Sequence, residues 1–194
     1  KNILARNAVT TNEFSSVIID SSIKQKINEV FKNEIKIEVE ASDQKYSGRC
    51  WLFAFLNVLR LKMMKKYKLK DFEFSQTYLF FWDKLEKCNF FLKNIIKTRI
   101  HKKDSRLIGF LLKDPANDGG QWNMIVNLVE KYGLIPKCVM RETFQSENSE
   151  DLNNILNNKL RECACQIRNM PLEEFKNINK YLQDIMYQIY TILV

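Results

Sequence analysis

The most informative stretch of this 194-residue sequence reads Gln44-Lys45-Tyr46-Ser47-Gly48-Arg49-Cys50-Trp51. It places a glutamine six residues before a cysteine from which a long apolar segment starts. If that segment is a helix, the unpaired N–H groups and partial positive charge of its N-terminus favour the thiolate form of Cys50. The Gln44 amide can then join the Cys50 backbone N–H in holding an oxyanion, where one donor contributes about 3–4 kcal/mol. The stretch therefore predicts a nucleophilic cysteine, Cys50, with Gln44 as its oxyanion donor.

Helix should dominate the chain, because apolar residues recur at three-and-four spacing while glycine (5) and proline (3) are scarce. The segment Cys50–Met64 is apolar on nearly every side, which predicts a helix buried at the centre of a domain. Further helices are expected over about Ser22–Phe31, Gln76–Lys97 after an N-cap at Ser75, Gln121–Tyr132 before a cap at Gly133, and from Pro171 into Val194. Residues 35–39 alternate by twos and are the clear strand candidate.

The amino-acid composition excludes several classes of protein. Hydrophobic residues make up 45% of the chain, enough for a folded core. No apolar run reaches the roughly eighteen residues of a membrane span, and the first residues lack the apolar run of a secretory signal, so we expect a soluble intracellular protein with no membrane partner. Five cysteines without a CxxC pair, together with a single histidine, argue against a disulfide framework and against a zinc site.

The chain carries a net positive charge, which does not by itself identify a binding partner. The formal net charge is +8, from 31 Lys and Arg against 23 Asp and Glu, which gives weak attraction to polyanions. The densest basic cluster follows the apolar segment and consists of Lys62, Lys65, Lys66, Lys68 and Lys70. We interpret it as a solvated helix end whose cations complement the helix dipole, in preference to a nucleic-acid surface.

Four blocks of sequence, in order, resemble the bleomycin hydrolase family of papain-like cysteine peptidases, also called aminopeptidase C. They are Asp43–Phe53, Phe72–Lys84, Asn117–Trp122 and Glu130–Pro136. The resemblance implies an α+β papain-like fold, of which this chain holds mainly the helical part with a central buried helix, while the β-barrel part is largely absent. Residues 1–40 would be an N-terminal arm with a short helix and strand, residues 41–145 the helical domain with the catalytic cysteine, and residues 146–194 a truncated helical extension.

The resemblance also implies an activity and partners. It implies a cytoplasmic aminopeptidase that hydrolyses N-terminal peptide bonds through a thioester, without metal or organic cofactor. Full-length members look like homohexameric rings around a basic channel, and some bind nucleic acid. Carried over by position, Cys50 is the nucleophile and Gln44 the oxyanion donor. Gly119 and Gly120 match the glycine pair along which the substrate backbone lies, since a side chain there would block its approach.

The neighbours of these residues have more than one interpretation. Trp51 is expected to anchor the core and also to shape the substrate cleft. Asp118 either caps the helix that follows, which we favour, or binds the amine of the substrate. Ser47 and Asn117 occupy the places where the wider papain family closes a disulfide, which agrees with a reducing compartment.

The four matching blocks do not contain the histidine that acts as general base in papain-like enzymes. In papain-like enzymes the histidine follows the nucleophile by roughly 130–150 residues, which counted from Cys50 reaches the end of this sequence. His101 is the single histidine and lies in a polar stretch, so we expect it at the surface. We therefore expect an N-terminal half of a longer enzyme, inactive alone because its histidine and asparagine lie elsewhere. Two alternatives stay open: a non-enzymatic basic protein that binds nucleic acid or forms a ring scaffold, and an inactive homologue.

Overall fold

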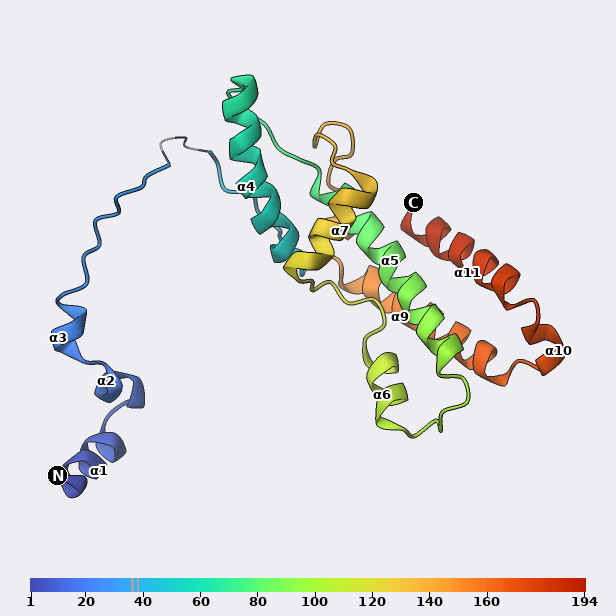
Figure 1. The fold of residues 1–194 in the computed structure, drawn as a ribbon, viewed down its shortest axis with the longest axis horizontal. Helices are drawn as coiled ribbons and strands as arrows, with labels where there is room; N and C mark the ends of the chain where they lie inside the picture. The colour runs from blue at the N-terminus through green and yellow to red at the C-terminus, as the bar shows by residue number, and fades with distance from the viewer. Residues whose placement is uncertain (36, 38) are drawn as a thin grey trace. The chain divides into compact units, whose positions relative to one another are not determined.

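The protein consists of two units, Lys1–Glu38 and Val39–Val194. This computed structural model describes residues 1–35, 37 and 39–194. The first unit carries three short helices, α1 (Asn2–Thr11), α2 (Phe14–Ile18) and α3 (Ser21–Lys24) (Figure 1). None of the side chains described in residues 1–35 is buried, so local hydrogen bonds hold these helices together.

The helix predicted over Ser22–Phe31 is wrong in its extent, because α3 ends at Lys24. Asp20 starts α3 by accepting a hydrogen bond from the Ser22 N–H at 2.8 Å. The apolar side chains of the predicted helix are 61–82% exposed, and they are Ile23, Ile27, Val30 and Phe31. A short helix whose apolar face packs on nothing is marginal in water, which explains the early end.

The strand predicted over residues 35–39 falls partly on residues 36 and 38, which lie outside the described residues. Ile35, Ile37 and Val39 belong to no strand. In the described part of the chain, β pairing is confined to two isolated bridges, Tyr46 with Asn148 and Phe74 with Pro136. The part of the α+β fold held by this chain is therefore mostly helical.

The second unit is arranged around one long helix, α5 (Gln76–Lys97). Against α5 pack α4 (Cys50–Tyr67), α7 (Trp122–Tyr132), α9 (Glu150–Asn169) and α11 (Ile178–Leu193) (Figure 1). The shorter helices are α6 (Arg106–Lys113), α8 (Phe144–Glu147) and α10 (Leu172–Phe175). As predicted, the Ser75 hydroxyl caps α5 by accepting from the Tyr78 N–H at 3.0 Å, and α7 ends at Gly133, whose φ of 74° suits glycine.

Two apolar clusters hold α5 along its length. The first joins α4, α5 and α7 and contains Leu52, Leu56, Phe74, Leu79, Phe80, Ile125 and Leu128. The second joins α5, α9 and α11 and includes Phe91, Leu92, Ile95, Leu156, Leu160, Ile185 and Ile189. Each fully buried side chain of this size contributes roughly 1.5–3 kcal/mol to the free energy of folding. The packing of α5 against its neighbours is therefore strongly stabilised.

The helix that starts at Cys50 is buried on one side only. Leu52 of α4 is fully buried, whereas Val58 is 57% exposed. The expectation that this helix is buried on nearly every side therefore holds for one face of α4 only. The helix α5 is buried more extensively, with buried residues from Gln76 to Ile95. Every helix in the described residues falls short of the length or apolar character needed to cross a bilayer.

The Asn-rich stretch after Ser149 forms the continuous helix α9. Its polar composition hides an apolar face, because Leu156, Leu160, Cys163 and Ile167 recur at three-and-four spacing and are at most 1% exposed. Asn157 on the same helix accepts a hydrogen bond from the Ala116 N–H at 3.0 Å. This contact joins α9 to the loop that precedes α7.

Candidate active site

Cys50 is the first residue of α4, and its side chain is exposed. It opens onto a groove of about 590 Å³. The groove is bounded by α4, α5, α6, α7 and the loop before α7. Its lining includes Cys50, Trp51, Lys87, Phe90, Phe110, Asn117, Gly119, Gly120 and Met124. The structure therefore gathers four predicted site residues, Cys50, Trp51, Gly119 and Gly120, in one place where a substrate can reach the thiol.

Gln44 lies half-buried in the loop that leads to α4. Lys45 follows it in the left-handed conformation, with φ 53°, and the Lys45 N–H donates to the Asp43 carboxylate at 2.8 Å. The Ser47 hydroxyl donates to the Gln44 carbonyl at 2.7 Å. The side-chain oxygen of Gln44 is buried and, within the described residues, accepts no hydrogen bond. Gln44 is not among the groove-lining residues, so its role as oxyanion donor stays a prediction.

Arg49, immediately before the nucleophile, organises this loop, and sequence reasoning does not identify it. Its buried guanidinium donates to Ser47 Oγ and to Glu142 Oε2, both at 2.8 Å. It also lies 5.1 Å from the ring centre of Phe53 and 5.4 Å from that of Phe80. A buried cation is tolerated when it is paired and hydrogen-bonded, so Arg49 fastens the loop before Cys50 to a distant part of the chain. The available signal was an arginine directly ahead of an apolar helix.

The two glycines of the predicted pair have different surroundings. A Cβ on Gly120 would lie 2.5 Å from Cε2 of the Trp51 ring, which is closer than real Cβ contacts come. A Cβ on Gly119 would meet nothing within 4 Å. The Trp51 indole N–H donates to the Asp118 carbonyl at 2.8 Å, so Trp51 both packs on the loop and lines the groove. Gly120 is thus required by packing, whereas Gly119 borders open space.

The preferred interpretation of Asp118 as a helix cap is wrong, because α7 starts after Gln121 and has no side-chain cap there. The Asp118 carboxylate instead accepts hydrogen bonds inside the fold. Its partners, at 2.5–3.1 Å, are Lys84 Nζ, Ser149 Oγ, Asn153 Nδ2 and the Gly48 N–H. Burial alone would raise its pKa, but the Lys84 ammonium and these hydrogen bonds lower it to about 2. Asp118 is therefore ionised and joins the loop before α4, the helix α5 and the start of α9.

His101 is exposed in the connection between α5 and α6, as expected. Its backbone carbonyl accepts a hydrogen bond from Arg168 Nη2 at 2.6 Å. His101 does not line the groove, and the groove lining contains no histidine. Within the described residues, therefore, Cys50 has no imidazole partner in the groove.

A long helix with a cysteine at its exposed N-terminus, crossed by a glycine-bearing loop, defines the cysteine-bearing helical part of a papain-like peptidase. The crystal structure of PepW from Lactobacillus rhamnosis HN001 is similar, with a TM-score of 0.81 and 41% identity over 98% of this chain and 43% of that one. The chain belongs to the Peptidase C1-like family, whose profile matches residues 1–194.

Two curated relatives confirm the resemblance predicted from the four blocks. Human bleomycin hydrolase is 47% identical over 171 residues, which is 87% of this chain and 38% of the relative. Aminopeptidase C of Listeria monocytogenes is 44% identical over 187 residues, which is 96% of this chain and 42% of the relative. The chain thus spans about two fifths of the length of the curated relatives it matches.

Proposed function

We propose that this chain supplies the nucleophile side of a cysteine aminopeptidase active site. The observation that carries the proposal is an exposed thiol, Cys50, at the N-terminus of α4, beside a groove whose wall includes Gly119 and Gly120. The attacking form of a nucleophilic cysteine is the thiolate, and an exposed thiol beside a groove is accessible to a substrate. The relatives' names, bleomycin hydrolase and aminopeptidase C, support hydrolysis of amide bonds at the amino end of a peptide.

In the proposed reaction, the Cys50 thiolate attacks the scissile carbonyl, and the Cys50 N–H and the Gln44 amide hold the oxyanion. An imidazolium gives its proton to the departing amine, and water then hydrolyses the thioester. We assign the imidazole and the asparagine that orients it to residues outside these 194, since the groove lining holds no histidine. The chain of 194 residues is accordingly expected to be inactive when it is produced alone.

The test is hydrolysis of an aminoacyl-coumarin by the complete protein encoded by the gene. Cys50→Ala should abolish release of the coumarin. Cys165→Ser is the matched control, because Cys165 is also an exposed thiol but is absent from the groove lining. Full activity in Cys50→Ala, or equal losses in both variants, would overturn the assignment of the nucleophile. Activity in the isolated 194-residue chain would overturn the assignment of the base to residues elsewhere.

A further inference from the structure

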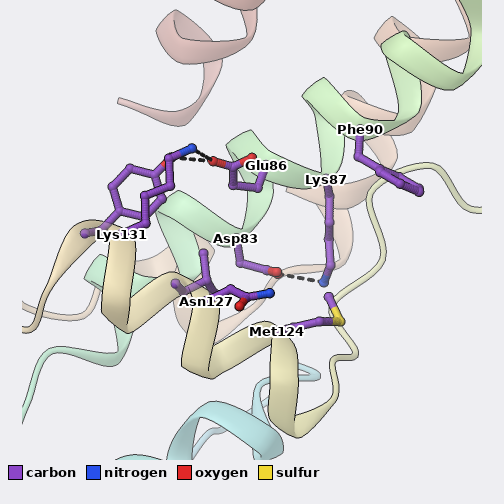
Figure 2. A pocket seen from close by; sticks show the side chains of 9 residues that line it. Asp83, Glu86, Lys87, Phe90, Met124, Asn127 and Lys131 are labelled. Atoms are coloured by element: carbon purple, nitrogen blue, oxygen red, sulfur yellow. Dashed lines mark hydrogen bonds and ion pairs between the residues drawn. The ribbon is translucent and has the colours of Figure 1, made fainter.

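Lys87 on α5 forms hydrogen bonds with the loop that carries the glycine pair. Its Nζ donates to the carbonyls of Asn117 at 2.7 Å and Gly119 at 2.8 Å, and to Asp83 Oδ2 at 2.6 Å. The ion pair with Asp83, one turn earlier on α5, is drawn in Figure 2. Lys87 Nζ also lies 5.4 Å from the ring centre of Trp51, the neighbour of the nucleophile. One ammonium group therefore contacts α5, the loop and the edge of the Cys50 groove.

The ammonium group of Lys87 has no donor left for a ligand. A lysine carries three N–H donors, and here three oxygen atoms accept them. The Lys87 side chain is 11% exposed and that of Asp83 is 3% exposed, so the ion pair between them is largely shielded from water. Lys87 is accordingly suited to hold the loop in one conformation and is unsuited to bind a substrate directly.

Within the described residues, Lys87 is the hydrogen-bond partner of the Gly119 carbonyl. A glycine has wide conformational freedom, and space is open where its Cβ would be. Since the peptide unit is planar, fixing the Gly119 carbonyl also fixes the direction of the Gly120 N–H. Gly119 and Gly120 both line the groove, so the orientation of this peptide plane defines part of the groove wall.

We propose that Lys87 is a positioning residue of the peptidase site: its ammonium group orients the Gly119 peptide plane, and with it the groove wall on which the substrate main chain lies. This inference rests on the proposed function. It goes further by assigning to α5, against which the other long helices of the unit pack, the control of the loop that carries the glycine pair.

Lys84, one turn before Lys87, shows what a purely structural lysine on the same face of α5 looks like. It is fully buried and donates to the Ala116 carbonyl at 2.6 Å and to the Asp118 carboxylate at 2.5 Å. It is absent from the groove lining, whereas Lys87 is part of it. Removing Lys84 should destabilise the fold, whereas removing Lys87 should leave the fold and loosen the groove wall.

The test compares Lys87→Met with Lys87→Arg in the complete protein, on aminoacyl-coumarin and on an unlabelled peptide. Methionine keeps most of the side-chain volume and removes every donor, so KM should rise about tenfold while kcat stays within about threefold. Arginine keeps the charge and donors, and should restore most of the lost affinity. Alkylation of Cys50 by iodoacetamide, a reagent too small to need the groove wall, should proceed at the wild-type rate in both variants.

Lys93→Met is the matched control, because Lys93 is an exposed lysine of α5 outside the groove lining. An unchanged KM in Lys87→Met, or an equal change in Lys93→Met, overturns the role of Lys87. If Lys87→Met does not fold, Lys87→Leu, which also lacks a donor, takes its place, and an unchanged KM there has the same meaning. Absence of activity in the wild-type protein contradicts the proposed function instead, so the two failures are told apart.

Discussion

The indole ring of Trp51 lies directly on Gly120, with ring carbon Cε2 2.5 Å from where a Cβ of residue 120 would be. The residue after the nucleophile therefore sets how closely the glycine loop approaches α4. The indole N–H strengthens the contact by donating to the Asp118 carbonyl at 2.8 Å. The distance between Cys50 and the opposite groove wall thus depends on a rigid aromatic ring and on a residue without a side chain.

Alanine should destabilise the protein at Gly120 but not at Gly119. Gly120→Ala forces a methyl group into the Trp51 ring and should lower the free energy of unfolding by about 1–3 kcal/mol, the usual cost of overpacking. Gly119→Ala meets open space and should leave stability nearly unchanged while raising KM. Denaturant unfolding of the two variants checks the first effect, and steady-state kinetics the second. Equal stability of both variants would show that the Trp51 contact is unimportant.

Breaking the buried pair of Lys84 with Asp118 should be costly. The Lys84 side chain is 0% exposed and that of Asp118 12% exposed, so Asp118→Asn leaves a cation in the interior with weaker partners. Loss of one partner of a buried pair typically costs about 3–5 kcal/mol. Glu162→Gln, in the exposed pair with Lys159, should cost less than about 1 kcal/mol and is the control. Chemical denaturation at neutral pH measures both.

Asp118 and Asp83 should give the stability opposite dependences on pH. The pKa of Asp118 is lowered to about 2 in the fold, so the stability that its ionised form contributes is present above about pH 4 and is lost as the pH falls toward 2. Burial raises the pKa of Asp83 to about 6, although Lys87 and Lys84 oppose the rise and Asp118 adds to it. The folded state therefore binds the Asp83 proton more tightly than the unfolded chain, and this contribution is full below about pH 4 and is lost as the pH rises through 6.

Asp83→Asn isolates the second of these effects, because an asparagine oxygen can still accept from Lys87. Between pH 4 and 6, the free energy of unfolding of the wild type should fall relative to that of Asp83→Asn. Urea unfolding of both proteins across this range measures the difference. Parallel curves for the two proteins would mean that Asp83 keeps an ordinary pKa in the fold.

Gln44→Ala should slow the chemical step. If the Gln44 amide holds the oxyanion, its loss should lower kcat by roughly 10²–10³-fold with little change in KM. Lys45→Ala changes the adjacent exposed side chain and should leave kcat unaltered. Both variants should react with iodoacetamide at the wild-type rate, since alkylation needs no oxyanion hole. A kcat within threefold of the wild type in Gln44→Ala would remove Gln44 from the mechanism.

Local pattern was enough to locate the helices that frame the site. The start of α4 at Cys50, the Ser75 cap of α5 and the end of α7 at Gly133 were all predicted, because a cap or a positive φ depends on residues within one turn. The same reasoning failed at α3, because the length of an isolated helix depends on whether its apolar face finds a partner.

The sequence predicted residues that line the groove, but not the long-range contacts that hold them in place. Cys50, Trp51 and the glycine pair follow from motifs, since their chemistry restricts which residues fit. Arg49 with Glu142, and Lys87 with Gly119, pair across 93 and 32 positions of sequence. Such pairs form because packed helices bring particular faces together and a buried charge must then find a partner. That requirement arises after the core has assembled, so a linear pattern of residues does not contain it.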